Sequence, residues 1–278
     1  MSNTKKIGEK DFFWEEDFEN FTKEKVKKYD FGINEYKFNQ NLYDPLLIQL
    51  LSSHISSKQM RILDAGGGTG KWSVFLAKLG HQVELLDISE PMLEMAEENI
   101  KRESLEDRIN IVCGSIDSIP YDNNSFDFII SERNPISHCG KRENAYRALS
   151  ELSRVLKPSG SILGCVLNKY RKVAQLTMDC EFDRAIELFE NGYLKRGDCG
   201  YSYYFGLEEL KIKLIENGFT EPEIVPTTAF SELIPTAWLL DSIPIKKLFV
   251  LEEKARRVPE LTSYGVRFHF SAKKDCNN

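Results

Sequence analysis

The sequence predicts an α/β fold built on a doubly wound, mainly parallel sheet with helices on both faces. Three observations lead to this prediction. From residue 60 onward, short apolar strand patterns alternate with amphipathic helix patterns. A run of glycines lies where the first of these strands gives way to a helix. The chain of 278 residues is 41% hydrophobic, which is enough for one large domain with additions.

The alternating part of the chain supplies the elements of this sheet. Helices are expected over residues 70–80, 89–105 and 140–160, and strands over 60–65, 81–87, 108–114, 125–131 and 161–168. Ser89 is a suitable N-cap for the second helix, with Pro91 in its first turn. Pro158 and Gly160 are expected to close the third helix.

Two segments depart from the alternation. Residues 1–58 predict a helical cap rich in aromatic residues, because ten of the 31 aromatics lie before residue 46. Its last helix should begin near Pro45. Residues 169–205 predict an inserted lid. The insertion and the chain after it are expected to form a helix over 174–192, a Gly- and Tyr-rich loop over 196–206, a helix over 206–219, a strand over 221–227, helical turns over 236–258 and a closing strand over 263–274.

Composition excludes several classes of protein. A net charge of −6 disfavours a broad nucleic-acid surface, which would need many Lys and Arg side chains against phosphates. No stretch approaches the ~20 apolar residues of a membrane span, and the charged first residues lack a signal-peptide pattern, so we expect a cytoplasmic protein. The six cysteines show no metal-ligand spacing, so we expect reduced thiols and no metal site.

The glycine run is the most informative segment of the chain. Gly66, Gly67, Gly68 and Gly70 lie between a strand and a helix, where backbone N–H groups are exposed and tight turns are allowed. Glycines two residues apart do not match the G-x-G-x-x-G of dinucleotide sites, and Lys71 stands at the wrong distance for a phosphate-binding P-loop.

Two acidic residues flank the glycine run. Asp64 stands directly before it, where a carboxylate would repel a pyrophosphate but suits an ammonium group; the alternative is that Asp64 caps the following helix. Asp87, at the end of the second strand, can accept hydrogen bonds from ribose hydroxyls. Together they predict a ligand that carries a ribose beside a zwitterionic, phosphate-free group, and S-adenosylmethionine fits this description.

Residues 60–168 resemble a class I S-adenosylmethionine-dependent methyltransferase of the type 11/25 kind. The resemblance rests on four segments in order: LDAGGGTGKWSVFLAKLG, VELLDISEPMLEMAEENI, IVCGSIDSIPYDNNSFDFIIS and ALSELSRVLKPSGSIL. It implies a Rossmann-like sheet of seven strands whose last strand is antiparallel, a role that the closing strand over 263–274 fits.

The resemblance also implies a set of cofactor-binding residues. It implies that Gly66, Gly68 and Gly70 approach the methionine part, with Gly67 serving the turn, that Asp64 holds the amino group and Asp87 the ribose, that Ile88 and Met92 lie near the adenine, and that Glu132 lines the reactive end. Ser115 stands where the family often has an adenine-contacting Asp. Ser115 is then either a weaker ligand or a turn residue. Asp117 is a candidate to replace the missing contact, and the backbone N–H of Ile116 can also serve the adenine.

The acceptor should bind beyond the carboxyl ends of the strands. His138 is the expected general base, unless it only makes a structural hydrogen bond. Arg133 either binds a substrate carboxylate or pairs with an acid. Tyr29, Tyr36 and Tyr43 either close over the cofactor or only cover the sheet edge and helix faces, and Tyr203 belongs to the inserted lid.

These features predict an enzyme that moves the methyl group of S-adenosylmethionine to a small molecule by direct displacement. We divide the chain into the cap (1–58), a cofactor-binding core (59–168), the lid (169–205) and the C-terminal part of the same domain (206–278). The alternatives are an RNA or protein methyltransferase and a non-catalytic cofactor-binding module. The acidic charge, and a loop that keeps only Asn134 and Pro135 of the N-P-P-Y motif, count against base methylation. The sequence leaves the oligomeric state open.

Overall fold

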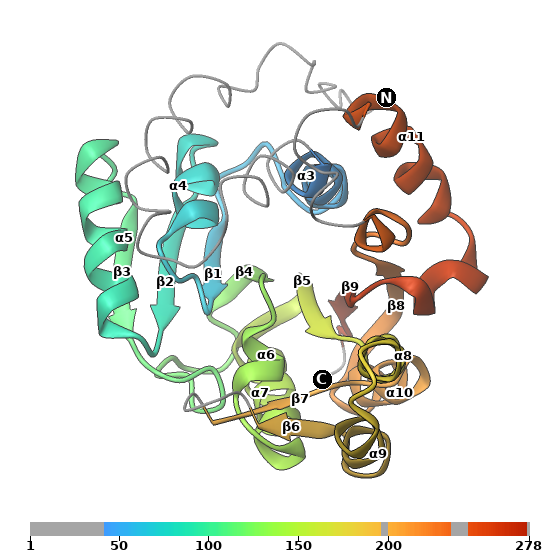
Figure 1. Cartoon of the computed structure of the whole chain (residues 1–278). Helices are drawn as coiled ribbons and strands as arrows, with labels where there is room; N and C mark the ends of the chain where they lie inside the picture. Colours follow the sequence, from blue (N-terminus) through green and yellow to red (C-terminus); the bar gives the residue numbers. More distant parts are fainter. Residues whose placement is uncertain (1–41, 196–199, 235–243, 277–278) are drawn as a thin grey trace.

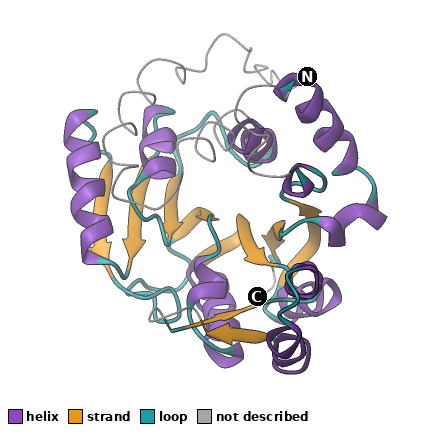
Figure 2. Ribbon diagram, viewed as in Figure 1, coloured by secondary structure: helices purple, strands orange, loops and turns teal. Residues whose placement is uncertain are grey.

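A seven-stranded sheet runs through the protein (Figures 1 and 2). The computed structural model describes residues 42–195, 200–234 and 244–276. The strands are β1 (Arg61–Ala65), β2 (Gln82–Asp87), β3 (Ile109–Cys113), β4 (Phe126–Ser131), β5 (Leu156–Leu167), β8 (Phe219–Pro226) and β9 (Arg267–Lys274). Their order across the sheet is β3-β2-β1-β4-β5-β9-β8, and β9 is antiparallel to both of its neighbours. The predicted fold class, with its antiparallel last strand, is confirmed.

Helices cover both faces of the sheet because buried side chains alternate along the strands. On one side lie α3 (Asp44–Ser52), α4 (Lys71–Lys78) and α5 (Glu90–Arg102), and on the other lie α6 (Pro135–His138), α7 (Arg142–Val155) and α10 (Leu207–Glu216) (Figure 1). In β4, Phe128 and Ile130 face the first layer, whereas Ile129 faces the second. This period of two is what a parallel strand buried on both faces requires.

The junction between α7 and β5 differs from the prediction. The helix expected over 140–160 ends at Val155, and Leu156–Gly160 already belong to β5. Pro158 explains the early end, because it has no N–H group to donate within a helix and it disfavours helical conformation at the preceding residue.

The insertion is more structured than expected. The single helix expected over 174–192 is a hairpin of two helices, α8 (Lys169–Met178) and α9 (Phe182–Asn191). They are separated by a turn in which Cys180 has a φ of 60°. Part of the expected loop after them is a strand, β7 (Tyr201–Tyr203), which pairs with β6 (Tyr193–Lys195).

The C-terminal part returns to the sheet through short helices and the strand β9. A turn η2 (Ser231–Leu233) precedes α11 (Ile245–Ala255), and η4 (Pro259–Tyr264) precedes β9. Helix α3 confirms the helix expected from Pro45, while the earlier aromatic residues lie outside the described part of the chain. None of the described helices has the length and apolar character needed to cross a membrane.

Candidate functional site

The glycine loop turns sharply at the carboxyl end of β1. Gly66, Gly68 and Gly70 have φ angles of 79°, 56° and 79°, a region that side-chain-bearing residues rarely adopt. A Cβ on Gly66 would lie 2.3 Å from Cβ of Pro135, so this glycine is required by packing. A Cβ on Gly68 would meet no atom within 4 Å. Gly68 is therefore the loop position where open space lies beside the backbone.

Asp87 lies beside this loop at the carboxyl end of β2. Its Oδ2 accepts the backbone N–H of Gly68 at 2.8 Å, and its Oδ1 accepts that of Ser89 at 2.9 Å. A carboxylate has about four acceptor positions, so Asp87 retains capacity for two further donors. The neighbouring Ile88 is 71% exposed, whereas Met92 is half-buried on α5.

Asp64 is a buried acid beneath the loop. Its Oδ2 accepts a hydrogen bond from the Ser73 hydroxyl at 2.6 Å. Burial raises the pKa of Asp64 to about 7, although the Ser73 bond opposes the shift. Asp64 also accepts the backbone N–H of Ser73 in the first turn of α4, so the alternative that it caps this helix fits as well. A buried carboxyl group with so high a pKa would be stabilised by a cationic ligand group.

Ser115 and Asp117 lie after β3 and are joined to each other. The Ser115 hydroxyl donates to Oδ1 of Asp117 at 2.5 Å, and Arg147 pairs with Oδ2 at 2.8 Å. Burial opposes ionisation, but the bonds from Ser115 and Arg147 together outweigh it and hold the pKa of Asp117 below its usual value. Ile116 packs into the core. Ser115 and Asp117 therefore form one polar unit at the position predicted for the adenine contact.

Glu132 follows β4 and is almost fully buried, with 3% of its surface exposed. Tyr43 donates to its Oε2 at 2.5 Å, and Nε2 of His269 lies 3.0 Å from its Oε1. Burial alone would raise the pKa of Glu132, but His269 and Tyr43 hold it below the usual value. Oε1 has no hydrogen bond of good geometry to any described residue. Glu132 is thus a buried, ionised carboxylate whose Oε1 lies against Nε2 of His269.

Arg256 fixes the protonation of His269. The guanidinium, which can only donate, lies 3.0 Å from Nδ1, so the proton of the neutral ring is on Nε2, 3.2 Å from the Tyr43 hydroxyl. Burial lowers the pKa of His269, and the neighbouring Glu132 opposes this shift. Glu132, Cys165 and His269 have ligand atoms within 4.8 Å of one another. A protonated Nε2 is not a metal ligand, so the arrangement favours a hydrogen-bond network over a bound cation.

The sequence alone did not identify Tyr43, His269 and Arg256 as neighbours of Glu132. The register of the sheet brings them together: His269 lies opposite Cys165 on β5, and Gly164 lies opposite Ser131 at the end of β4. Only the pairing of β9 with β5, which sequence patterns do not specify, could have revealed this network.

Arg133 and Asn134 continue the loop with unusual backbone geometry. Their φ angles are 67° and 68°, and neither residue is a glycine. Two such residues in succession cost about 1–2 kcal/mol each, and this kind of strain concentrates at functional sites. The exposed Arg133 guanidinium lies 4.9 Å from the centre of the Tyr43 ring. Nearby, Lys71 at the start of α4 forms an ion pair with Asp44 of α3.

His138 and Tyr203 belong to a different set of contacts. Nδ1 of His138 lies 3.0 Å from the Ser202 hydroxyl of β7, a structural hydrogen bond. Tyr203 is 1% exposed, and its hydroxyl bonds Glu209 and Arg142. The prediction that Tyr203 contacts substrate therefore does not fit, because this side chain is buried against α7 and α10. Tyr29 and Tyr36 lie outside the described residues.

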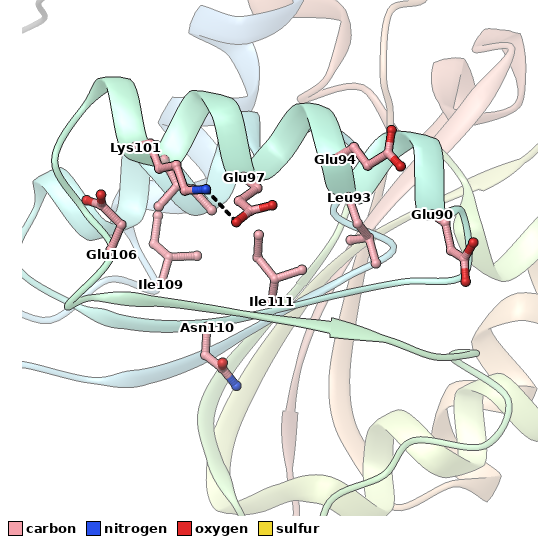
Figure 3. A pocket seen from close by; sticks show the side chains of 10 residues that line it. Glu90, Leu93, Glu94, Glu97, Lys101, Glu106, Ile109, Asn110 and Ile111 are labelled. Carbon is pink, nitrogen blue, oxygen red and sulfur yellow. Dashed lines mark hydrogen bonds and ion pairs between the residues drawn. The ribbon is translucent and has the colours of Figure 1, made fainter.

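A groove between α5 and β3 lies apart from these residues (Figure 3). It has a volume of about 530 Å³. Its lining is Glu90, Leu93, Glu94, Glu97, Ile100, Lys101, Glu106, Ile109, Asn110 and Ile111. None of the predicted site residues lines it, so it is distinct from the candidate site at the carboxyl ends of β1, β2 and β4.

Comparison with known proteins finds similarity to methyltransferases. Residues 62–160 match the family model described as a methyltransferase domain. A glycine/sarcosine/dimethylglycine N-methyltransferase of Actinopolyspora halophila is 38% identical over 108 residues, which make up 38% of this chain and 18% of that protein. A demethylmenaquinone methyltransferase of Clavibacter sepedonicus is 37% identical over 108 residues, or 38% of this chain and 40% of that protein.

Solved structures agree in fold. An S-adenosylmethionine-dependent methyltransferase from Methanosarcina mazei superimposes with a TM-score of 0.56 at 17% identity, covering 81% of this chain and 97% of that one. The chain spans less than half of each of the two curated relatives it matches. Residues 62–160 thus match the methyltransferase-domain family, and the chain has the fold of an S-adenosylmethionine-dependent methyltransferase; S-adenosylmethionine is the cofactor that this family and fold imply.

Proposed function

We propose that this chain transfers a methyl group from S-adenosylmethionine to a small-molecule acceptor. The observation that carries the proposal is the convergence of Asp64, Gly68 and Asp87 at one edge of the sheet. Asp64 supplies a buried carboxyl group that a cation would stabilise, and Gly68 leaves open space beside the backbone. Asp87 supplies a carboxylate with two further acceptor positions.

Each of these residues has a role that its geometry supports. Asp64 would hold the ammonium group of the cofactor, and Asp87 would accept two ribose hydroxyls. The exposed Ile88 would lie against the adenine, with Met92, the Ser115–Asp117 pair and the backbone of Ile116 as further candidates on that side. Gly66, Gly67 and Gly70 would keep the loop in shape, since a Cβ on Gly66 or Gly67 would lie within 3 Å of neighbouring side chains and Gly70 has a positive φ.

The acceptor side offers a base. When bound, S-adenosylmethionine supplies an activated methyl group, so the protein mainly has to align the nucleophile and exclude water. Such positioning contributes roughly 7–11 kcal/mol in favourable systems. Glu132, held ionised by Tyr43 and His269, would accept the proton that an acceptor O–H or N–H must lose. Arg133 would bind an anionic part of the acceptor.

His138 is the second candidate base, and its bond to Ser202 favours a structural role instead. Glu132→Gln should remove most of the turnover while preserving the fold, because the amide keeps the shape of the carboxylate. If His138→Gln removes the turnover and Glu132→Gln does not, the base is His138.

A small-molecule acceptor is supported by the names of the two relatives, which refer to glycine derivatives and to demethylmenaquinone. The acceptor itself can be sought by incubating the protein with labelled S-adenosylmethionine and a metabolite extract. Label in the low-molecular-mass fraction is expected. Label that disappears after RNase or protease treatment would point to an RNA or protein acceptor.

The cofactor proposal can be tested without the acceptor. Isothermal titration should detect binding of S-adenosylmethionine and none of NAD. Asp87→Ala should weaken S-adenosylmethionine binding by tenfold or more, because two hydrogen bonds to a charged group are lost. Unchanged affinity in this variant would refute the ribose role, and binding without any methyl transfer would favour a non-catalytic module.

A further inference from the structure

The α8–α9 hairpin exposes an apolar face that no described part of the chain covers. On α9, Phe182, Ile186 and Phe189 follow one another at helical spacing and are 56–58% exposed. On α8, Tyr170, Ala174 and Met178 form a second row at intervals of four residues, all of them exposed. Because Tyr170 and Phe189 are in ring contact at 6.1 Å, the two rows lie next to each other.

The apolar arc of α9 is wider than its own fold requires. Ala185 and Leu188 are buried against Leu176 of α8. Phe182, Ile186 and Phe189 extend the arc beyond this contact into solvent. An isolated exposed apolar residue needs no explanation, but a contiguous face of five large ones marks an interaction site.

From this face we infer that the chain forms a two-fold symmetric dimer in which two α8–α9 hairpins pack into a four-helix bundle. The inference concerns assembly and goes beyond the proposed function. Each aromatic side chain can bury about 150–250 Å², so the exposed parts of the five large residues amount to roughly 500 Å² per copy. With a polar rim, that approaches the roughly 800 Å² that each partner contributes to a stable interface.

Charges at the two edges of the face match a second copy. The outer edge of α9 carries the exposed acids Asp183, Glu187 and Glu190. The corresponding outer edge of α8 carries Arg171. A two-fold axis parallel to the helices lays α8 of one copy over α9 of the other and brings acidic edge against basic edge. Because Tyr170 and Phe189 are in contact, they lie at the same height along the hairpin. In the dimer, Arg171 of one copy therefore faces Glu190 of the other.

Sedimentation velocity of the full chain tests the inference. The unmodified protein should sediment with twice the chain mass of 32.0 kDa. Ile186→Glu should raise the dimer dissociation constant at least tenfold. Ile212→Glu is the matched control, because Ile212 is 51% exposed on the separate helix α10 and should leave the dimer intact. A monomeric unmodified protein, or equal effects of the two variants, would overturn the proposal.

Charge reversal tests the geometry. Arg171→Glu should weaken the dimer, and adding Glu190→Arg to it should restore most of the loss. Circular dichroism should report unchanged helix content in all variants. No rescue by the double variant would overturn this arrangement of the hairpins. If the protein sediments as a monomer and yet Phe182 and Phe189 are shielded from solvent, the dimer is ruled out and another segment of the same chain covers this face.

Discussion

At the scale of single residues, the proposed contact between Asp64 and the cofactor should make the binding affinity depend on pH. Without ligand its pKa is raised to about 7 by burial, so about half of the molecules carry a neutral Asp64 at pH 7. A ligand ammonium favours the carboxylate and lowers this pKa. The stabilisation is therefore fully present above pH 7 and is lost as the pH falls below it.

We predict that S-adenosylmethionine binds about tenfold more weakly at pH 5.5 than at pH 7, where the α-amino group of the ligand, with a pKa near 8, stays charged. Calorimetric titration in buffers of different ionisation enthalpy should detect the release of about half a proton at pH 7. Asp64→Asn is the control and should bind weakly with a flat pH profile. A wild-type affinity that does not change with pH would show that Asp64 meets no charged group.

Gly68 allows stability and binding to be separated. Gly68 and Gly80 both have positive φ, at 56° and 97°, and a Cβ on either would meet open space. Replacing either by alanine should therefore lower the free energy of unfolding by a similar amount, about 1–2 kcal/mol. Only Gly68→Ala should weaken cofactor binding, because its methyl group would occupy the space beside Asp87. Urea unfolding and calorimetric titration of both variants provide the measurement.

Equal cofactor affinity in the Gly68 and Gly80 variants would place the ligand elsewhere.

At the scale of elements, the sequence predicts most of the sheet but less of its junctions. Asp64 and Asp87 could be found because each stands next to a strong local pattern, a glycine run or the end of an apolar strand. His269 could not, because its role depends on which strand lies beside β9. The sequence does not indicate the turn between α8 and α9, because Cys180 is not a usual residue for a φ of 60°.

Arg256 joins three elements at the far end of the site. Its guanidinium donates to the carbonyl oxygens of Leu46, Pro226 and Thr227, and so ties α3 to the end of β8. Burial lowers its pKa to about 10, which leaves it charged at neutral pH. Removal of the guanidinium would take one donor from each of these three carbonyls and from Nδ1 of His269.

We predict that Arg256→Met lowers the free energy of unfolding by about 3–5 kcal/mol, the usual cost of removing one member of a buried charged network. The neighbouring Arg257 is the control. Its side chain is 76% exposed and forms a surface ion pair with Glu253, so Arg257→Met should cost less than about 1 kcal/mol. Chemical unfolding of the two variants measures both values, and similar losses would mean that the buried bonds contribute little.

At the scale of the whole molecule, ligand binding should act as a global stabiliser. The candidate site draws residues from α3, the loops after β1, β2 and β4, and the strand β9. S-adenosylmethionine at a hundred times its dissociation constant should add about 2.7 kcal/mol to the free energy of unfolding. For a domain of this size, that corresponds to a rise of roughly 5–10 °C in Tm.

Thermal scans with S-adenosylmethionine and with NAD test this, and only the first should raise Tm. A similar rise with NAD would contradict the cofactor assignment. Asp87→Ala should abolish most of the rise and so confirm that it comes from this site.

The position of β9 has a consequence for how the protein is made. β9 is the last described strand in the chain, yet it lies between β5 and β8. During synthesis, β5 and β8 therefore remain without their shared partner until β9 emerges, and unpaired strand edges are prone to association with other chains. Because β9 also brings His269 to Glu132, a nascent chain that lacks β9 has neither a complete sheet nor the His269–Glu132 contact of the proposed base. Sheet completion and site assembly thus become the same late event.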